Sequence, residues 1–221
     1  MRPNLVIAIV SACALGACVS AAPPSGAASP AIGAPVSAQF EAPVDQPSGI
    51  YALDPAHASV LWRVSHFGLS MYTGRFNTIA AQLDFDGQAP QNSKIAVTIA
   101  AASVDTGHQA LGGKKDFNAE IANAAFGAEK NPQITFLSTS VTRTGPASGK
   151  LIGDLTLNGV TKPAVLDVTF YGGKANPFNG KQRLGFAARG KLKRTDWGVT
   201  NWAGAVGEDV ELVIEAEFQK Q

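Results

Sequence analysis

From Gly49 to the C-terminus, the chain is a succession of short segments in which apolar and polar residues alternate. A period of two residues is typical of strands that bury one face, because successive side chains point to opposite sides of a strand. In Val60–His66, for example, Trp62 and Val64 alternate with Arg63 and Ser65. Eight segments are predicted to be strands on this basis: Val60–His66, Ile79–Phe85, Lys94–Ile99, Ile134–Thr142, Lys150–Leu157, Ala164–Tyr171, Arg183–Lys193 and Val210–Phe218.

Turn residues and one helical segment separate these strands. Asn158-Gly159 stands between two apolar runs and is the strongest hairpin signal in the chain. From Lys114 to Ala128 apolar residues recur at helical spacing, which predicts one short helix, with Asp116 placed to cap its start and Gly127 its end. The predicted fold is all-β with antiparallel strands. The spacing of the strands alone does not distinguish a sandwich from a closed barrel.

The N-terminus has the character of a targeting sequence. Leu5–Leu15 is an apolar run of 11 residues, which suits a signal-peptide core and is too short to span a bilayer. Leu15-Gly16-Ala17-Cys18 resembles the lipobox of bacterial lipoproteins, where the chain is cut before the cysteine and lipid is attached to it. We expect residues 1–17 to be a signal peptide and Cys18 to be lipidated. An ordinary secretory signal cut nearby is the alternative.

The segment that follows is expected to be a tether. Val19–Ser48 contains six prolines and eight alanines but only two charged residues, Glu41 and Asp45. Such a composition has little to bury and is typical of disordered spacers. Residues 18–48 are therefore predicted to link a membrane anchor to a folded domain over residues 49–221, although an arm packed on the domain is the alternative. By the habit of lipoproteins, Val19 after the cysteine indicates the outer membrane. The expected location is the bacterial cell envelope, facing the periplasm.

Charge and motif content exclude several function classes. The formal net charge is +1, whereas nucleic-acid binders usually carry a strongly basic domain. Both cysteines, Cys13 and Cys18, lie in the first 20 residues, so the folded domain has no disulfide and no thiolate metal site. The histidines His57, His66 and His108 are scattered without metal-ligand spacing. We find no motif that marks a nucleophile and expect no catalytic residue, metal or cofactor.

One strand carries a basic side. Arg183, Arg189, Lys191 and Lys193 share one parity within their predicted strand. A solvated outer face is the expected role. The alternative is a patch facing anionic lipid head groups, which attract such bases.

Several motifs of the domain occur in an order that resembles one known family. They are Tyr51–Val60, Val64–Gly68, Thr73–Phe76, Asn131–Ser138, Gly153–Pro163 and Arg194–Val199. In this order and spacing, they resemble the YceI family of secreted bacterial proteins. The chain departs from the family where Asp116-Phe117 is followed by a longer Ala-rich segment, and where Lys130-Asn131-Pro132 replaces a Tyr-Pro entry. These departures leave the role of residues 114–132 open.

The resemblance implies an eight-stranded antiparallel lipocalin-like barrel that binds, stores or transports an isoprenoid lipid in an apolar tunnel. The implied ligand is a quinone or a polyprenyl phosphate, with His66 and Arg75 as candidate head-group contacts. The candidate lining residues are Trp62, Val64, Phe76, Phe85, Phe136, Leu155, Leu166, Phe186 and Leu212. The alternatives are an enzyme or redox partner acting on a bound lipid, and a structural lipoprotein whose barrel is filled with side chains. A homodimer stays open, because the sequence does not set the oligomeric state.

Overall fold

A computed structural model of the protein describes residues 46–108, 110–113 and 116–221, which belong to one compact unit. The expected signal peptide, Cys18 and the tether lie outside the described residues, apart from the last three residues before Gly49. No helix in the described part of the chain is long and apolar enough to cross a membrane. The elements are β1 (Gly49–His66), β2 (Ser70–Phe76), β3 (Ile79–Phe85), η2 (Pro90–Asn92), β4 (Lys94–Ala100), η3 (Ala101–Ser103), β5 (Val104–Asp105), α1 (Phe117–Phe126), β6 (Gln133–Arg143), β7 (Ser148–Leu157), β8 (Val160–Ala175), β9 (Gln182–Lys193), η4 (Arg194–Trp197) and β10 (Val206–Lys220).

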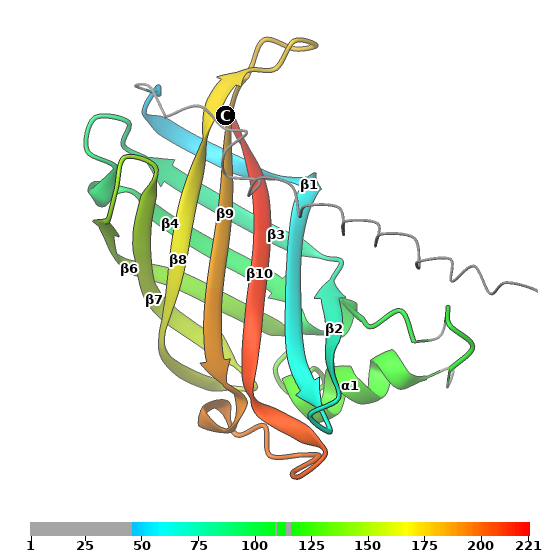
Figure 1. The fold of residues 1–221 in the computed structure, drawn as a ribbon. Coiled ribbons are helices and arrows are strands. Elements are labelled where there is room, and N and C mark those ends of the chain that lie inside the picture. Colours follow the sequence, from blue (N-terminus) through cyan, green and yellow to red (C-terminus); the bar gives the residue numbers. More distant parts are fainter. Residues whose placement is uncertain (1–45, 109, 114–115) are drawn as a thin grey trace, which may run out of the picture. The chain divides into compact units, whose positions relative to one another are not determined.

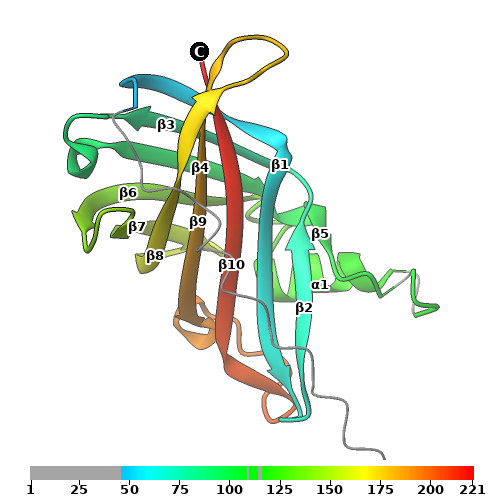
Figure 2. The same cartoon turned by 45° about the horizontal axis from the view of Figure 1, so that its top comes forward.

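Eight of these strands form a closed antiparallel barrel (Figures 1 and 2). The order around the ring is β10-β9-β8-β7-β6-β4-β3-β1, and β10 pairs again with β1, so the sheet has no free edge along this seam. Each of the eight predicted strands overlaps one strand of the ring. The predicted eight-stranded barrel is therefore confirmed, and the sandwich is excluded.

Two further strands, β2 and β5, were not predicted. The first residues of β1, Gly49–Ala52, pair with β3, whereas Val60–His66 pair with β2. β5 then pairs with the end of β2. Because β1 is 18 residues long, it holds β2 and β3 one after the other along the same edge. The barrel wall is thereby extended beside the second half of β1.

The hairpin between β7 and β8 has the geometry that its sequence predicts. Leu157 and Val160 are paired, which leaves Asn158 and Gly159 as a two-residue turn. Both residues have positive φ angles, 51° and 75°. Asn and Gly are the residues that such a primed turn favours, because most other side chains are strained there.

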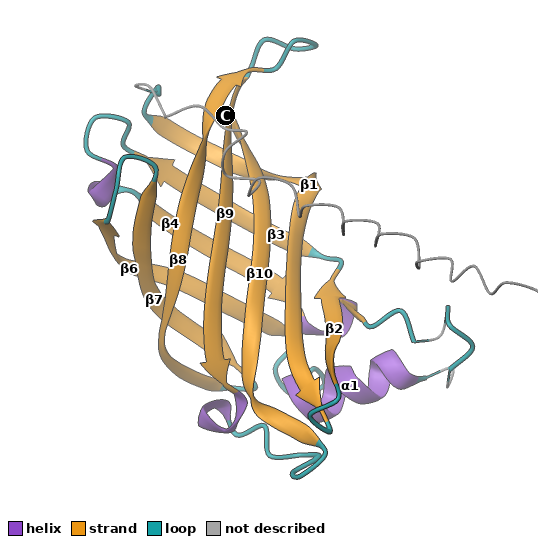
Figure 3. Ribbon diagram, viewed as in Figure 1, coloured by secondary structure: helices purple, strands orange, loops and turns teal. Residues whose placement is uncertain are grey.

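The predicted helix is present as α1 and lies at one end of the barrel, beside β2 (Figure 3). Gly127 ends it in the left-handed conformation, with φ of 62°, as expected. Asp116 occupies the N-cap position, but its side chain makes no capping hydrogen bond. The helix turns Ile121 and Ala122 into the core.

The interior contains two apolar clusters. One gathers around Tyr51, whose hydroxyl donates a hydrogen bond of 2.6 Å to the carbonyl of Pro47. The other is larger and runs from Trp62 and Phe76 across the barrel to Leu166 and Trp197. Inward residues of nearly every strand contribute to these clusters, as the period of two requires. The space enclosed by the barrel is the main feature of functional interest.

Candidate ligand cavity

The barrel encloses a cavity of about 820 Å³. Ligand pockets usually measure about 300–1,000 Å³, so this cavity has room for a substantial molecule. Its lining is predominantly aliphatic and aromatic, and it is supplied by the barrel strands together with α1. A cavity of this composition offers shape and apolar surface rather than a network of specific polar contacts.

Ten of the eleven sequence-predicted ligand residues line this cavity. They are Trp62, Val64, His66, Phe76, Phe85, Phe136, Leu155, Leu166, Phe186 and Leu212. They share one property, which is an inward position on a strand of the wall. The structure therefore brings them together around one space, while their contact with a ligand stays a prediction.

Arg75 is the exception and does not line the cavity. Phe76 is buried in the barrel, and its neighbour along the strand must point the other way. Arg75 is exposed and pairs in register with Asp105 of β5. A hydrogen bond from the backbone N–H of Gly107 lowers the pKa of Asp105, and the positive charge of Arg75 adds to this effect. Arg75 thus faces the outer surface, and its expected head-group role is wrong.

Among the described residues, two buried side-chain polar atoms of the lining have no hydrogen-bond partner. They are Nε1 of Trp62 and the hydroxyl of Tyr72, both of which are buried. The two rings are neighbours, with centroids 6.2 Å apart. A buried indole N–H normally finds an acceptor, as Trp197 does by donating to the carbonyl of Leu155 at 3.1 Å. The side chain of Trp62, only 8% exposed, lines the cavity, and its Nε1 is buried without an acceptor.

Helix α1 forms part of the wall next to these two rings. Phe126 lies 6.0 Å from the ring of Trp62 and 5.0 Å from that of Phe76, measured between centroids. Phe117 approaches Tyr72 in the same way, at 6.5 Å. The helical spacing predicted the helix but not its place in the wall. Sequence reasoning missed many lining residues, among them Tyr72, His108 and the α1 residues Phe117, Ile121 and Phe126.

Arg194 is a buried charge that organises one edge of the cavity. Its guanidinium donates to four backbone carbonyls, those of Val199 (2.6 Å), Asn201 (2.7 Å), Gly207 (2.8 Å) and Val206 (3.1 Å). The carbonyls of Val199 and Asn201 lie in the connection between η4 and β10, and those of Val206 and Gly207 at the start of β10, so this one side chain satisfies buried backbone acceptors of both. The planar fork of an arginine suits this task better than the single ammonium of a lysine.

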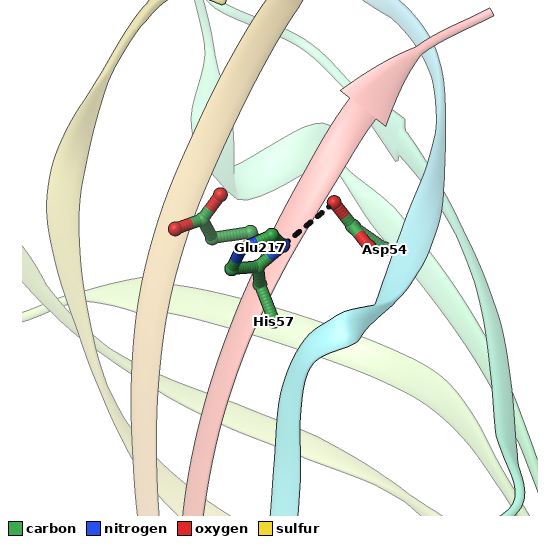
Figure 4. A group of neighbouring side chains, drawn as sticks. All are labelled: Asp54, His57 and Glu217. Atoms are coloured by element: carbon green, nitrogen blue, oxygen red, sulfur yellow. Dashed lines mark hydrogen bonds and ion pairs between the residues drawn. The ribbon is translucent and has the colours of Figure 1, made fainter.

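A second polar cluster lies away from the cavity, where β1 is bulged between Leu53 and Ala58 (Figure 4). Asp54, His57 and Glu217 place one ligand atom each within 4.8 Å of one another, as a metal site would. Arg183, however, lies 2.9 Å from the carboxylates of both Asp54 and Glu217. A divalent cation here would face the charge of this guanidinium, so we interpret the cluster as an ion-pair network.

The same network sets the charge state of Asp54. The side-chain hydrogen bond with His57, at 2.9 Å, is the largest of the influences that lower the pKa of Asp54. The backbone N–H of Ala56 and the charge of Arg183 add to it. The carboxylate is therefore held in its charged form, and it closes the bulge of β1 onto β9 and β10.

The basic side of β9 is matched by acids on β10. Arg189 pairs with Glu215 at 2.6 Å, and Arg183 with Glu217 at 2.9 Å. The two lysines make analogous pairs: Lys191 with Asp209 and Lys193 with Glu208, both at 2.9 Å. These side chains are partly exposed, as expected for a solvated outer face. Because each base has an acidic partner, the face offers little net charge to anionic lipid.

The fold and the cavity define a lipocalin-like barrel protein, in which a closed antiparallel wall and a helix surround an apolar ligand space. Residues 51–218 match the family model of the YceI-like domain. The chain belongs to this family. The match covers almost all of the described barrel.

Curated relatives agree with this assignment, and a solved structure shows the same fold. A UPF0312 protein of Serratia proteamaculans is 42% identical over 161 residues, which cover 73% of this chain and 80% of the relative. Protein YceI of Salmonella arizonae is 41% identical over 165 residues, 75% and 83% of the two chains. BcnA of Burkholderia cenocepacia superposes with a TM-score of 0.65 at 23% identity, over 75% of this chain and 98% of BcnA.

A third solved structure is described as a polyisoprenoid binding domain from Saccharophagus degradans that is implicated in plant cell wall breakdown. It superposes with a TM-score of 0.51 at 14% identity and covers 77% of this chain and 98% of that domain. At this identity, the likeness is one of fold.

Proposed function

We propose that the barrel binds an isoprenoid lipid in its interior and acts as a carrier or store rather than as an enzyme. The observation that carries this proposal is the apolar cavity of about 820 Å³ inside a closed wall. A prenyl chain is a repeat of apolar units, and each CH₂ group removed from water contributes about 0.8 kcal/mol. Ordering the flexible chain offsets part of that gain. A long tail still binds tightly without many specific contacts.

The similarity to a polyisoprenoid binding domain supports the same ligand class. The support is indirect, because that domain and this chain share 14% identity. The stronger argument is the lining of this chain's own cavity, in which inward residues such as Phe136, Leu155 and Leu166 present aliphatic and aromatic surface.

Among isoprenoid lipids, the unpartnered donors favour a quinone over a polyprenyl phosphate. The side chains of Trp62 and Tyr72 line the cavity and carry an N–H and a hydroxyl without a partner, so a small rotation of either ring would offer a donor to the carbonyl oxygen of an uncharged head group. A phosphate would be better served by cations. Of the lining cations, Lys94, Arg143 and Lys150 stand near the start of β4, the end of β6 and the start of β7, away from α1 (Figure 1). The fourth, Arg194, already donates to four backbone carbonyls.

The N-terminal sequence supports a place at the cell envelope. We propose that the chain is a lipoprotein held at the outer membrane by lipidated Cys18, with the barrel in the periplasm. The lipobox-like Leu15–Cys18 and the Pro- and Ala-rich segment after it carry this part of the proposal. A chain tethered in this way stays close to the membranes in which isoprenoid lipids reside.

An equilibrium titration tests the proposed ligand class. A ubiquinone with a long prenyl tail is added in detergent to the purified protein, and binding is followed by quenching of tryptophan fluorescence. We expect saturable binding of one quinone per barrel. Trp62→Ala should weaken this binding while circular dichroism still reports a folded barrel, because the indole is part of the cavity wall. No saturable binding of either a quinone or a polyprenol would contradict the proposal.

A further inference from the structure

Two neighbouring loops near α1 contain no Asp, Glu, Lys or Arg. One is the β1–β2 turn with the strand ends beside it, residues 64–74, and the other is the connection from η4 to β10 with the element ends beside it, residues 197–207. The backbone N–H of Phe67 donates to the carbonyl of Ala205 at 2.7 Å, so the two loops touch. Figure 1 shows both at the same end of the barrel. We call residues 64–74 and 197–207 the uncharged rim.

The rim exposes large apolar side chains to solvent. Leu69 is 87% exposed, Phe67 61% and Trp202 36%, and Met71 is exposed as well. Apolar side chains that gather at one place on a surface usually mark an interaction site for a protein or a membrane. Charged neighbours, which would keep such a patch in water, are absent from these two loops.

The backbone of the rim is strained at two of these aromatic residues. Phe67 and Trp202 have positive φ angles of 51° and 61°. Bulky residues seldom adopt this conformation, because their Cβ atoms clash with the backbone. At both positions a glycine would relieve the strain, yet the chain places a large apolar ring there. Strain of this kind clusters where function requires it.

The rim is also continuous with the cavity. His66, Tyr72, Trp202 and Val206 belong to the two loops and line the cavity. Arg194 holds the second loop in place through its four carbonyl contacts. The exposed apolar surface therefore begins where the lining of the ligand space ends.

We propose that the uncharged rim inserts into the surface of a lipid bilayer, so that an isoprenoid lipid passes between the membrane and the cavity without crossing water. This inference rests on the proposed function, since only a membrane lipid needs such a route. Indole rings favour the boundary between head groups and acyl chains, whereas charged side chains are costly there. A neutral edge with Trp202, Phe67 and Leu69 fits an uncharged, zwitterionic bilayer.

The same molecule provides a matched control. Phe178 is 95% exposed and lies in the connection between β8 and β9, at the opposite end of the barrel (Figure 1). Lys174 and Lys181 flank that connection. An equally exposed apolar side chain can thus be removed from a loop that does not border α1 or the uncharged rim.

The test uses the full chain with Cys18→Ser, which removes acylation, and phosphatidylcholine vesicles whose acyl chains carry bromine. Bromine quenches tryptophan fluorescence at short range. Trp62 and Trp197 are buried, so the rim is reported by the difference between this chain and its Trp202→Phe variant. We expect brominated vesicles to quench the Trp202 component. The double change Phe67→Ser and Leu69→Ser should weaken vesicle binding about tenfold or more, whereas Phe178→Ser should leave it unchanged.

The results that would overturn the rim proposal differ from those that would overturn the proposed lipid-binding function. Absence of quenching of Trp202, or an equal loss of binding in Phe178→Ser, would overturn the rim proposal. All variants share the same N-terminus. Vesicle binding through residues 1–45 would therefore be equal in all of them and cannot produce the predicted difference between the Phe67/Leu69 variant and Phe178→Ser. Binding that requires anionic lipid and is abolished by salt would also overturn it. Failure of the proposed function would look different, because the rim would then dock while the barrel took up no quinone in detergent.

Discussion

The indole ring of Trp62 lies over Gly74, its partner residue in the ladder between β1 and β2. A Cβ atom at position 74 would overlap the indole. The same arrangement recurs where Leu166 covers its partner Gly190, and Phe136 covers Gly153, a diagonal neighbour on the adjacent strand. At these positions the wall has no side chain, because the residue is a glycine. The large neighbouring side chain can therefore lie flat against the backbone, which leaves space in the middle of the barrel.

Gly74→Ala should displace the Trp62 ring into the cavity. We expect a loss of about 1–3 kcal/mol in the free energy of unfolding, which is typical of overpacking, together with weaker quinone binding. Chemical denaturation and a quinone titration measure the two effects. Gly185→Ala is the control, because a Cβ there meets the side chain of Tyr171 only at 3.6 Å, an ordinary contact distance. Equal effects of the two changes would show that the Trp62 contact has no special role.

The unpartnered donors of Trp62 and Tyr72 predict that their removal lowers the affinity for a quinone but changes the stability of the fold little. Trp62→Phe and Tyr72→Phe remove an N–H and a hydroxyl that have no partner in the protein, so the fold should lose little through hydrogen bonding. Each change should reduce the affinity for a quinone about 3- to 10-fold, while the affinity for a prenyl hydrocarbon without a carbonyl stays the same.

Trp197→Phe provides the comparison for this pair. It removes a donor that is bonded to the carbonyl of Leu155, which should cost about 1–3 kcal/mol of stability because that carbonyl stays buried. Thermal unfolding and ligand titration distinguish the two indoles. If Trp62→Phe and Tyr72→Phe bind quinone as tightly as the unmodified chain, the head group does not use these donors.

Arg194→Lys should be strongly destabilising although it preserves the charge. A lysine cannot reach four carbonyls with a planar fork, so several buried carbonyls lose their donor and the ammonium is buried with fewer partners. We expect a loss of about 3–5 kcal/mol in the free energy of unfolding. Arg189→Lys, on the exposed outer face, should cost less than about 1 kcal/mol. Similar costs for both changes would refute the organising role of Arg194.

The ion-pair network at the bulge of β1 predicts that the free energy of unfolding depends on pH in the acidic range. Because hydrogen bonding to His57 lowers the pKa of Asp54 in the folded protein, the carboxylate stabilises the fold above its ordinary pKa of 3.8. This contribution is lost as the pH falls through the lowered folded value. Urea unfolding at a series of pH values should therefore show a smaller loss of stability on acidification in Asp54→Asn. His57→Ala should flatten the profile in the same direction, and an unchanged slope in both variants would count against this network.

The period of two was sufficient to place the barrel strands, since each of them buries one face. It failed for β2 because Thr73, Gly74 and Arg75 interrupt the apolar pattern, and this strand is held by pairing with the long β1. The misplacement of Arg75 has the same origin. Without a strand at 70–76, Arg75 and Phe76 were both assigned to the ligand, although adjacent residues of a strand face opposite sides.

Other parts of the site depend on contacts that no local pattern contains. Helical spacing located α1, but the position of Phe126 against Trp62 follows from the closure of the whole barrel. The contrast between Trp62 and Trp197 depends on whether a carbonyl lies within reach of each indole N–H. The role of Arg194 could have been suspected from Arg194–Gly198, where a base and a tryptophan precede a long uncharged connection.

The most direct test of the account is native mass spectrometry of the Cys18→Ser chain purified from a bacterial host, followed by solvent extraction and identification of the lipid. The account predicts one isoprenoid lipid per chain, released with the mass of a quinone. A protein that is recovered empty, and that takes up neither added quinone nor added polyprenol, would contradict the proposed function of the cavity.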